Sequence, residues 1–419
     1  MALLWTFCGR WSCNLGISLF RHLWHSSHSP SALLSVPGRE SSKTCRSRHD
    51  RIVFKMGFWF HARKSRTLLS NEQTVLFCTP IKLFHLSQRK CCCSKVKHKS
   101  PFELVQNDLK NFYDDIKKEL PPSVTELKEM CEYYFNKGGK AFRPMIVMLM
   151  ARACNENDNR ELLSGQRAIA LITEMIHTAS LVHDDVIDGS DTRRGLKTVN
   201  QIWGERKAIL AGDFILSSAS ILLARIGSTP VVSIVSKIID DLVRGEFMQL
   251  GSKESENERF AHYLEKTFKK TASLLANSCK AVSVLGNSDP EVHEIAYQYG
   301  KNIGIAFQLI DDVLDFTSCA DQLGKPAAAD LKLGLATGPV LFACQQFPEL
   351  NAMIMRRFRY QGDVELAWKY VLQSDGVQQT VYLAQRYCHE AIRHLSKLRP
   401  SMEKNALLQL TEIVLTRDK

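Results

Sequence analysis

The chain has 419 residues and is 45% apolar, enough for a sizeable buried core in one large domain or two ordinary ones. Its net charge of +11 comes from one end, because residues 1–100 hold 17 of the 55 Lys and Arg but only 3 of the 44 Asp and Glu. These hundred residues carry +14 and the rest carries −3. The body therefore lacks the basic surface of a nucleic-acid-binding protein, and no nucleic-acid partner is expected.

The first hundred residues have the composition of a mitochondrial targeting leader. They are basic, rich in Ser and His, and open with an apolar stretch interrupted by Arg over residues 1–24. This pattern predicts import into the mitochondrial matrix; a basic tail without a targeting signal is the alternative. We expect residues 1–100 to have no fixed structure and residues 101–419 to form the folded domain.

The cysteines and the apolar runs exclude two other classes of protein. Seven of the 13 cysteines lie in the leader and the other six are scattered without a CxxC pair, which favours reduced, buried thiols over a zinc site or disulfides. The longest apolar neighbourhood, residues 168–182, contains Glu174 and His177, so no run approaches the ~18 residues of a transmembrane helix. We expect at most a peripheral contact with a membrane.

From residue 102 onward nearly every segment repeats apolar residues at intervals of three and four, which predicts an all-α fold. Pro, Gly, Ser and Asn separate the segments, and no linker divides the body, so we expect a single large helical bundle. In chain order, the helices are expected at residues 107–120, 125–135, 144–150, 167–188, 208–226, 231–250, 258–285, 290–316, 338–346, 384–398 and 402–415.

Two of these helices end in carboxylate clusters of the same spacing. In each cluster two aspartates four residues apart lie on one helix face, close enough to hold a hard cation such as Mg²⁺. A single acidic pair such as Asp240–Asp241 is commonly a solvated helix end, but two matching clusters beside a core would be costly without cations or a proton. They predict a site for a metal-bound diphosphate. The first carboxylate cluster is Asp184, Asp185 and Asp188, and the second is Asp311, Asp312 and Asp315.

Basic residues lie at matching places along the chain. Taken singly, each is an ordinary surface charge; together with the carboxylates they indicate two diphosphate groups, one held through metal and one bound directly. The residues concerned are Lys140 and Arg143 after Gly138-Gly139, Arg193 and Arg194 after the first cluster, and Lys266 and Lys325 on either side of the second.

In combination these motifs resemble those of the trans-isoprenyl (polyprenyl) diphosphate synthases, and within them the mitochondrial decaprenyl and solanesyl diphosphate synthases of animals. The resemblance covers essentially all of residues 100–419. It implies a bundle of the isoprenoid synthase type around a central apolar cavity. The matching segments are residues 139–144 (GKAFRP), 183–188 (HDDVID), 193–195 (RRG), 245–249 (GEFMQ), 266–267 (KT), Gln308 and 311–315 (DDVLD).

The resemblance implies a role for each of these residues in binding two substrates and magnesium. Isopentenyl diphosphate would be bound by Lys140, Arg143, His177 and Arg194. Two or three Mg²⁺ ions would be held against the allylic diphosphate by Asp184, Asp188, Asp311 and Asp315, with Asp185 and Asp312 completing the catalytic set. The allylic diphosphate would also contact Arg193, Lys266, Thr267, Gln308 and Lys325.

The reaction implied is repeated head-to-tail condensation. Loss of the allylic diphosphate would leave a cation, the double bond of isopentenyl diphosphate would attack it, and loss of a proton would give a trans chain five carbons longer. By resemblance, the substrate is an allylic diphosphate such as farnesyl diphosphate. The product would be an all-trans polyprenyl diphosphate of about C45–C50, the side-chain precursor of ubiquinone.

Product length is expected to depend on the residues one turn before Asp184, because each residue back along the helix lies about 1.5 Å deeper. Relatives with short products have bulky aromatic residues there, whereas this chain has Ala179 and Ser180. The small side chains favour a long product; close packing between helices is the alternative reason for them.

One departure from the family leaves alternatives open. Leu335 occupies a position where family members usually have Lys, so one contact to the allylic diphosphate is missing. Leu335 leaves room for a non-catalytic subunit of a heteromeric prenyl synthase, although the intact carboxylate clusters argue against it. A shorter-chain synthase and a terpene cyclase are further alternatives, although a cyclase would lack the second cluster. By resemblance we expect a hetero-oligomer with a related second subunit.

Overall fold

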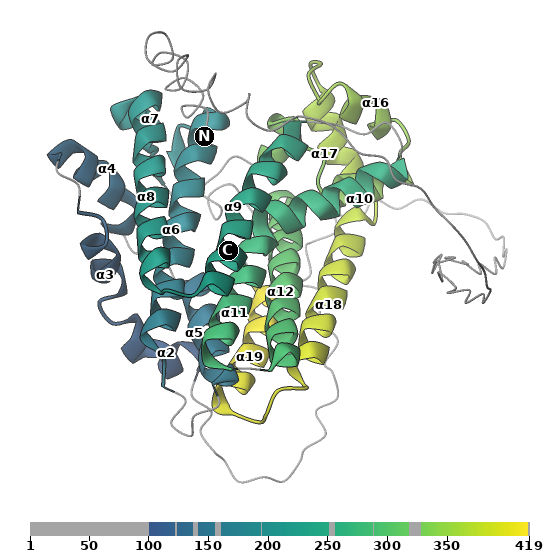
Figure 1. Cartoon of the computed structure of the whole chain (residues 1–419). Coiled ribbons are helices and arrows are strands. Elements are labelled where there is room, and N and C mark those ends of the chain that lie inside the picture. Colours follow the sequence, from purple (N-terminus) through teal and green to yellow (C-terminus); the bar gives the residue numbers. More distant parts are fainter. Residues whose placement is uncertain are drawn as a thin grey trace, which may run out of the picture. The chain divides into compact units, whose positions relative to one another are not determined.

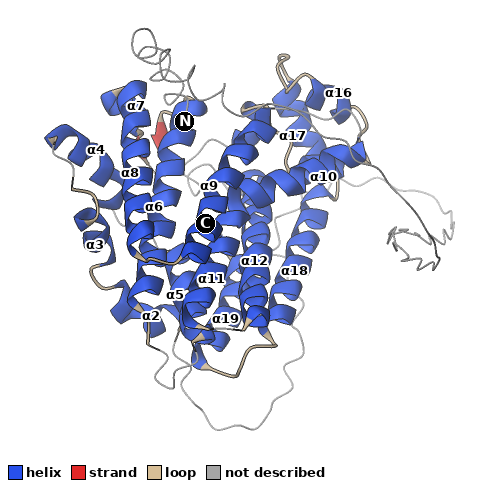
Figure 2. Ribbon diagram, viewed as in Figure 1, coloured by secondary structure: helices blue, strands red, loops and turns tan. Residues whose placement is uncertain are grey.

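The computed structural model describes residues 100–121, 124–136, 141–155, 161–193, 195–250, 256–287, 289–317 and 328–417. The expected leader lies outside these residues except for Ser100, and so do Lys140, Arg194 and Lys325. Residues Val96–Lys419 form one compact unit. The all-α prediction is confirmed, since the described residues are helical apart from loops and a single short hairpin of β1 (Thr192–Arg193) and β2 (Leu196–Lys197) (Figure 2).

The N-terminal helices differ from the prediction. A single helix was expected over residues 107–120, but the structure has α2 (Pro101–Leu109) and α3 (Phe112–Lys118). The break is at Asn111, whose φ of 58° is left-handed, a conformation that Asn tolerates better than most residues. The next helix, α4 (Thr125–Asn136), agrees with the prediction.

The centre of the bundle is α11 (Ser273–Gly286), in which ten of 14 residues are buried. It contacts α5, α6, α9 and α12, so the two helices that end in carboxylates lie on either side of it (Figure 1). The bounds of the surrounding helices are α5 Phe142–Cys154, α6 Ser164–Ile187, α7 Val199–Trp203, α8 Glu205–Arg225, α9 Thr229–Leu250 and α12 Pro290–Thr317.

The helix predicted over residues 258–285 contains a change of pitch. It consists of α10 (Glu256–Thr267), the five-residue π-helical turn η1 (Phe268–Ala272) and α11. Opposite this turn α12 has Gly304, and one turn earlier Gly300 packs against Leu275 of α11. An added Cβ on Gly304 would lie 2.7 Å from the Cα of Ala272, so glycine permits a close helix contact at the π-helical turn. Turns of this kind are frequent at functional sites.

The C-terminal third completes the bundle. The helix expected over residues 384–398 is part of the longer α18, on which Ala384, Cys388, Ala391 and Leu395 are buried. The helix expected over residues 338–346 is shorter and ends at Ala343. The bounds are α14 Ala329–Lys332, α15 Gly338–Ala343, α16 Leu350–Met355, α17 Asp363–Gln373, α18 Gly376–Leu395 and α19 Met402–Thr416.

The described cysteines, Cys131, Cys154, Cys279, Cys344 and Cys388, are buried and free, as expected. One described helix, α8, is long and apolar enough to cross a membrane by length and composition alone. Core helices of soluble proteins pass the same test, so this feature is weak evidence for a membrane span.

Candidate active site

One cleft of about 1360 Å³, counted out to open solvent, is lined by Asp184 of the first carboxylate cluster and by all three aspartates of the second. On α6 the lining residues His177, Ser180, Leu181 and Asp184 recur at intervals of three and four and therefore share a helix face. On α12 the lining residues Phe307, Gln308, Asp311, Asp312 and Asp315 repeat this pattern. The structure thus brings together two clusters that lie more than a hundred residues apart in the sequence.

The first carboxylate cluster, at the end of α6, brings several negative charges close together. Burial raises the pKa of Asp184 to about 7, and the nearby carboxylates of Glu246 and Asp188 contribute to the increase. The pKa of Asp188 is raised as well, again chiefly by burial. Buried carboxylates that resist ionisation are stabilised as anions by a cation placed between them.

Asp185 faces away from this pair and is fully engaged with protein. One carboxylate oxygen accepts a hydrogen bond from the Tyr134 hydroxyl at 2.7 Å, and the other accepts from Nε of Arg193 at 2.6 Å. The side chain is 1% exposed. Asp185 therefore holds Arg193, which reaches back from β1, at the edge of the cleft. Its position indicates a positioning role rather than contact with metal.

Asp312 has the corresponding role in the second cluster. It accepts hydrogen bonds from the Tyr263 hydroxyl at 2.5 Å and from the Gln308 side-chain amide at 2.8 Å. Gln308 in turn accepts from the Thr271 hydroxyl at 2.9 Å. Burial raises the pKa of Asp312 to about 6, although the Tyr263 and Gln308 hydrogen bonds oppose the increase. This network fixes the α12 end relative to α10 and η1.

Asp311 and Asp315 each bind a segment that follows them in the chain. Asp311 accepts from Nη2 of Arg417 at 2.6 Å. Asp315 accepts from the backbone N–H groups of Ala329 at 3.1 Å and Asp330 at 3.3 Å. Both carboxylates thus already accept hydrogen bonds from protein donors.

A lysine that the sequence analysis did not select, Lys270, lies at the first cluster. Its Nζ is 3.9 Å from Oδ1 of Asp184 and forms an ion pair with Glu246. The negative groups around it raise the pKa of Lys270 despite its burial. It is carried by the π-helical turn η1, together with Thr271, and both line the cleft.

The placement of Lys266 and Thr267 in the allylic site needs correction, because neither lines the cleft. Lys266 lies one turn before Lys270 and lines a neighbouring pocket, with Nζ 5.6 Å from the centre of the Tyr263 ring. Thr267 is 2% exposed with a buried hydroxyl. The Lys-Thr pair that lines the cleft is Lys270-Thr271, because the π-helical turn carries that second pair toward α6.

The expected isopentenyl site is partly assembled. Nη1 of Arg143, on α5, lies 3.1 Å from Nε2 of His177 on α6, and both residues line the cleft. Arg417, which the sequence analysis also missed, stacks on the Phe307 ring at 3.6 Å while bonding Asp311. The Arg143 guanidinium lies 5.7 Å from the same ring. Two arginines from opposite ends of the domain thus converge on Phe307.

The two residues expected to control product length lie in different environments. Ser180 lines the cleft, and its hydroxyl donates to the His177 carbonyl oxygen at 2.8 Å. Ala179 is fully buried and is not among the residues that line the cleft. Ser180 is therefore the more direct contact for a substrate chain.

The donor set fits divalent magnesium. In the described part of the chain, no three side chains of His, Cys, Asp or Glu lie close enough together to enclose an ion. Each cluster instead offers two carboxylates, and Mg²⁺ is typically held by one or two carboxylates together with substrate phosphates and water. The raised pKa values of Asp184 and Asp188 agree with a site that gains from a cation.

Comparison with known proteins agrees with this geometry. Residues 124–371 match the polyprenyl synthetase family model. The chain belongs to the polyprenyl synthetase family. It is 75% identical over 325 residues to the human all trans-polyprenyl-diphosphate synthase PDSS1, covering 77% of this chain and 78% of that protein. It is 41% identical over 343 residues to the mitochondrial solanesyl-diphosphate synthase 1 of rice, covering 77% and 80%.

Solved structures of the family support the fold. Heptaprenyl diphosphate synthase from Staphylococcus aureus matches with a TM-score of 0.71 and 30% identity, covering 75% of this chain and 99% of that one. Polyprenyl synthase from Caulobacter crescentus, complexed with calcium and isoprenyl diphosphate, matches with a TM-score of 0.69 and 30% identity over 76% and 97%. The predictions of a prenyltransferase and a mitochondrial protein are confirmed.

Proposed function

We propose that this polyprenyl synthetase extends an allylic diphosphate by repeated condensation with isopentenyl diphosphate to a long all-trans polyprenyl diphosphate, the side-chain precursor of ubiquinone. The observation that carries the proposal is the cleft itself. It combines Asp184 with Asp311 and Asp315, and it also contains the Arg143–His177 pair. A site of this kind can hold one diphosphate through metal and a second through direct hydrogen bonds.

Two or three Mg²⁺ ions per site would be held by Asp184 and Asp188 on one side and by Asp311 and Asp315 on the other. When bound, they neutralise the charge that develops on the departing diphosphate. The support is the chemistry of the donors: they are hard oxygen ligands at the ends of two helices that line one cleft, and Asp184 lies partly buried among like charges.

The protein side chains position the allylic diphosphate. Lys270 and Arg193 supply positive charge beside the first cluster, and Gln308 supplies a side-chain amide beside the second. Arg193 is oriented by Asp185, and Gln308 is oriented by Thr271 and Asp312. These groups stabilise negative charge on the leaving group with little reorganisation, because their partners already hold them in place.

Arg143 and His177 bind the diphosphate of isopentenyl diphosphate and orient its double bond toward the allylic carbon. The bond from that carbon to the diphosphate oxygen breaks with its electron pair, and the double bond of isopentenyl diphosphate forms the new carbon–carbon bond. A proton is then lost to the released diphosphate, so no protein side chain needs to act as a covalent nucleophile.

The growing chain extends along α6 away from Asp184. Ser180, and behind it Ala179, are small, which leaves room for a product of many isoprene units. We further propose that the chain acts in the mitochondrial matrix and as part of a hetero-oligomer with a related second subunit, which would complement the site where Leu335 replaces a cationic residue.

Turnover of farnesyl and isopentenyl diphosphates with Mg²⁺ tests the proposal. The chain alone and the chain with its candidate partner are compared by product length and rate, with Asp184→Asn in the same complex as the variant. We expect a long all-trans product from the complex and a loss of activity with Asp184→Asn. A complex that retains full activity with Asp184→Asn would show that this chain is not the catalytic one.

A further inference from the structure

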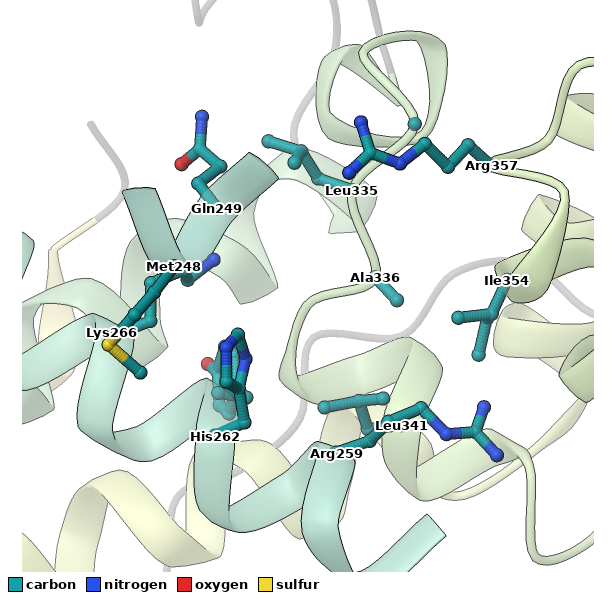
Figure 3. Close-up of a pocket in the computed structure, with 12 residues that line it drawn as sticks. Met248, Gln249, Arg259, His262, Lys266, Leu335, Ala336, Leu341, Ile354 and Arg357 are labelled. Atoms are coloured by element: carbon teal, nitrogen blue, oxygen red, sulfur yellow. The ribbon is translucent and has the colours of Figure 1, made fainter. Parts of the chain in front are cut away.

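A second pocket, separate from the cleft, is lined by cationic side chains. Figure 3 shows Lys266 and His262 on one side and Arg357 and Arg259 on the other. It encloses about 570 Å³, counted out to open solvent. None of the described residues that line it is Asp or Glu. We call it the cationic pocket. Three cationic side chains around one space, with no Asp or Glu among the described residues of the lining, make a favourable place for an anion.

Arg259 is the strongest sign that the pocket is built for a ligand. It is 8% exposed, and two of its guanidinium nitrogens, Nε and Nη1, have no hydrogen-bond partner. Its third nitrogen, Nη2, donates to the neutral side chain of Asn351 at 2.7 Å. A buried guanidinium with unused donors is costly, and an anion that accepts from it would remove the cost.

Lys266 adds a second buried cation. Burial lowers the pKa of Lys266, although the charges of Asp312, Asp330 and Glu246 oppose the decrease, and its ammonium group lies over the Tyr263 ring. The opposite end of Tyr263, its hydroxyl, donates to Asp312 in the cleft. Tyr263 is therefore the partition between the two sites, with its ring lining the cationic pocket and its hydroxyl bound to the second carboxylate cluster.

The third cationic side chain of the pocket, Arg357, lies on a turn with an unusual backbone conformation. Arg357 and Phe358 have φ values of 55° and 52°, both left-handed, directly after α16. Gly334, whose φ is 77°, packs against this turn, because an added Cβ would lie 3.1 Å from the Cβ of Arg357. Strained turns persist where the surroundings enforce them. Here the two turns bring Arg357 beside Leu335 (Figure 3).

We propose that the cationic pocket is a metal-independent binding site for a diphosphate group, adjacent to but distinct from the cleft. The affinity for an anion is inferred from the pocket alone. The choice of diphosphate rests on the proposed function, because the cleft binds this group and Tyr263 lies between the cleft and the pocket. The diphosphate comes either from the released leaving group or from the head of a prenyl chain, whose tail would contact Leu341 and Ile354.

Binding of inorganic diphosphate to the full chain in EDTA, measured by calorimetry, tests the site. Because the expected isopentenyl site is also cationic, the titration is made in an Arg143→Gln background. We expect one bound equivalent, weakened about tenfold or more by Lys266→Met and by Arg357→Gln. Arg359→Gln, an exposed neighbour outside the pocket, is the matched control and should leave the affinity within about twofold.

A parallel titration with farnesyl diphosphate distinguishes the two sources. If inorganic diphosphate saturates the pocket, the released leaving group is sufficient for binding. If farnesyl diphosphate binds and inorganic diphosphate does not, the ligand is the head group of a prenyl chain. The proposal is overturned if neither ligand binds without metal, or if Lys266→Met and Arg357→Gln both leave binding unchanged. If Lys266→Met does not fold, the effect of Arg357→Gln on diphosphate affinity decides the test, because Arg357 is only half-buried. Because no turnover or metal is involved, failure here is separate from failure of the synthase reaction.

Discussion

Replacement of Lys270 tests which lysine contacts the allylic diphosphate. The structure indicates Lys270, whereas the sequence indicated Lys266. The Lys270→Met variant keeps much of the side-chain volume and removes the charge next to Asp184. At the observed separation of 3.9 Å, an effective dielectric of about 20 gives an interaction of about 4 kcal/mol. The two side chains are 23% and 20% exposed, so solvent screens the pair only partly.

The expected kinetic effect is smaller than this Coulomb energy, because Lys270 also pairs with Glu246, whose own charge loses its partner in the variant. We expect a loss of about 2–3 kcal/mol in transition-state stabilisation, or a kcat/KM about 30- to 150-fold lower. Two causes act together. The pKa of Asp184, which is about 7 with Lys270 present, rises further, so a proton competes with metal, and the allylic diphosphate loses a cationic contact.

The assay is steady-state formation of polyprenyl product from farnesyl and isopentenyl diphosphates at neutral pH. Lys269→Met is the matched control, because Lys269 is next in the chain but pairs with Asp241 and Glu265 outside the cleft. It should stay within about threefold of wild type. Activity of Lys270→Met within about threefold of wild type, or an equal loss in Lys269→Met, would refute the assignment of Lys270 to the site.

Three further predictions follow from the same cleft. Ser180→Phe should shorten the product more than Ala179→Phe, measured by chromatography of the products, because only Ser180 lines the cleft; unchanged lengths in both would defeat the account of chain length. Arg417→Ala should raise the KM for isopentenyl or allylic diphosphate at least several-fold by releasing the contacts to Asp311 and Phe307, and an unchanged KM for both substrates would contradict it. Gly300→Ala should lower the free energy of unfolding by roughly 1–3 kcal/mol in denaturant titrations, because its Cβ would lie 2.6 Å from the carbonyl oxygen of Leu275; wild-type stability would show that α12 can move away from α11.

Periodicity and spacing predicted the parts of the site that depend on a single helix. Asp184 and Asp188 lie four apart on α6, so their common face follows from helix geometry alone. The same holds for Asp311 and Asp315 on α12. Their approach to each other could be inferred only from the match between the two clusters, which is why the second copy was the decisive sequence signal.

Residues whose position depends on a departure from regular helix geometry were not predictable in this way. Lys266-Thr267 and Lys270-Thr271 are both Lys-Thr pairs, and only the π-helical turn places the second one at the cleft. An apolar pattern does not distinguish a π turn from an α turn. The left-handed Asn111, which divides the first predicted helix, was missed for the same reason.

Contacts between residues far apart in the chain could not be predicted from the sequence either. Arg417 lies 106 residues after Asp311, and Tyr134 lies 51 residues before Asp185, so no local pattern links them. The acidic pair Asp240–Asp241 shows the same limit. We expected a solvated helix end, but only Asp240 is exposed, whereas Asp241 is 2% exposed and accepts a hydrogen bond from Ser273.

The central claim is that both carboxylate clusters act together on one allylic diphosphate. Its most direct test is product formation by the complex as a function of Mg²⁺ concentration, with Asp184→Asn and Asp311→Asn measured separately. Asp240→Asn, outside the cleft, serves as the control. The account predicts that each cluster variant loses at least about a hundredfold in kcat and needs more Mg²⁺, while Asp240→Asn retains activity. Near-normal turnover after loss of either cluster would contradict it.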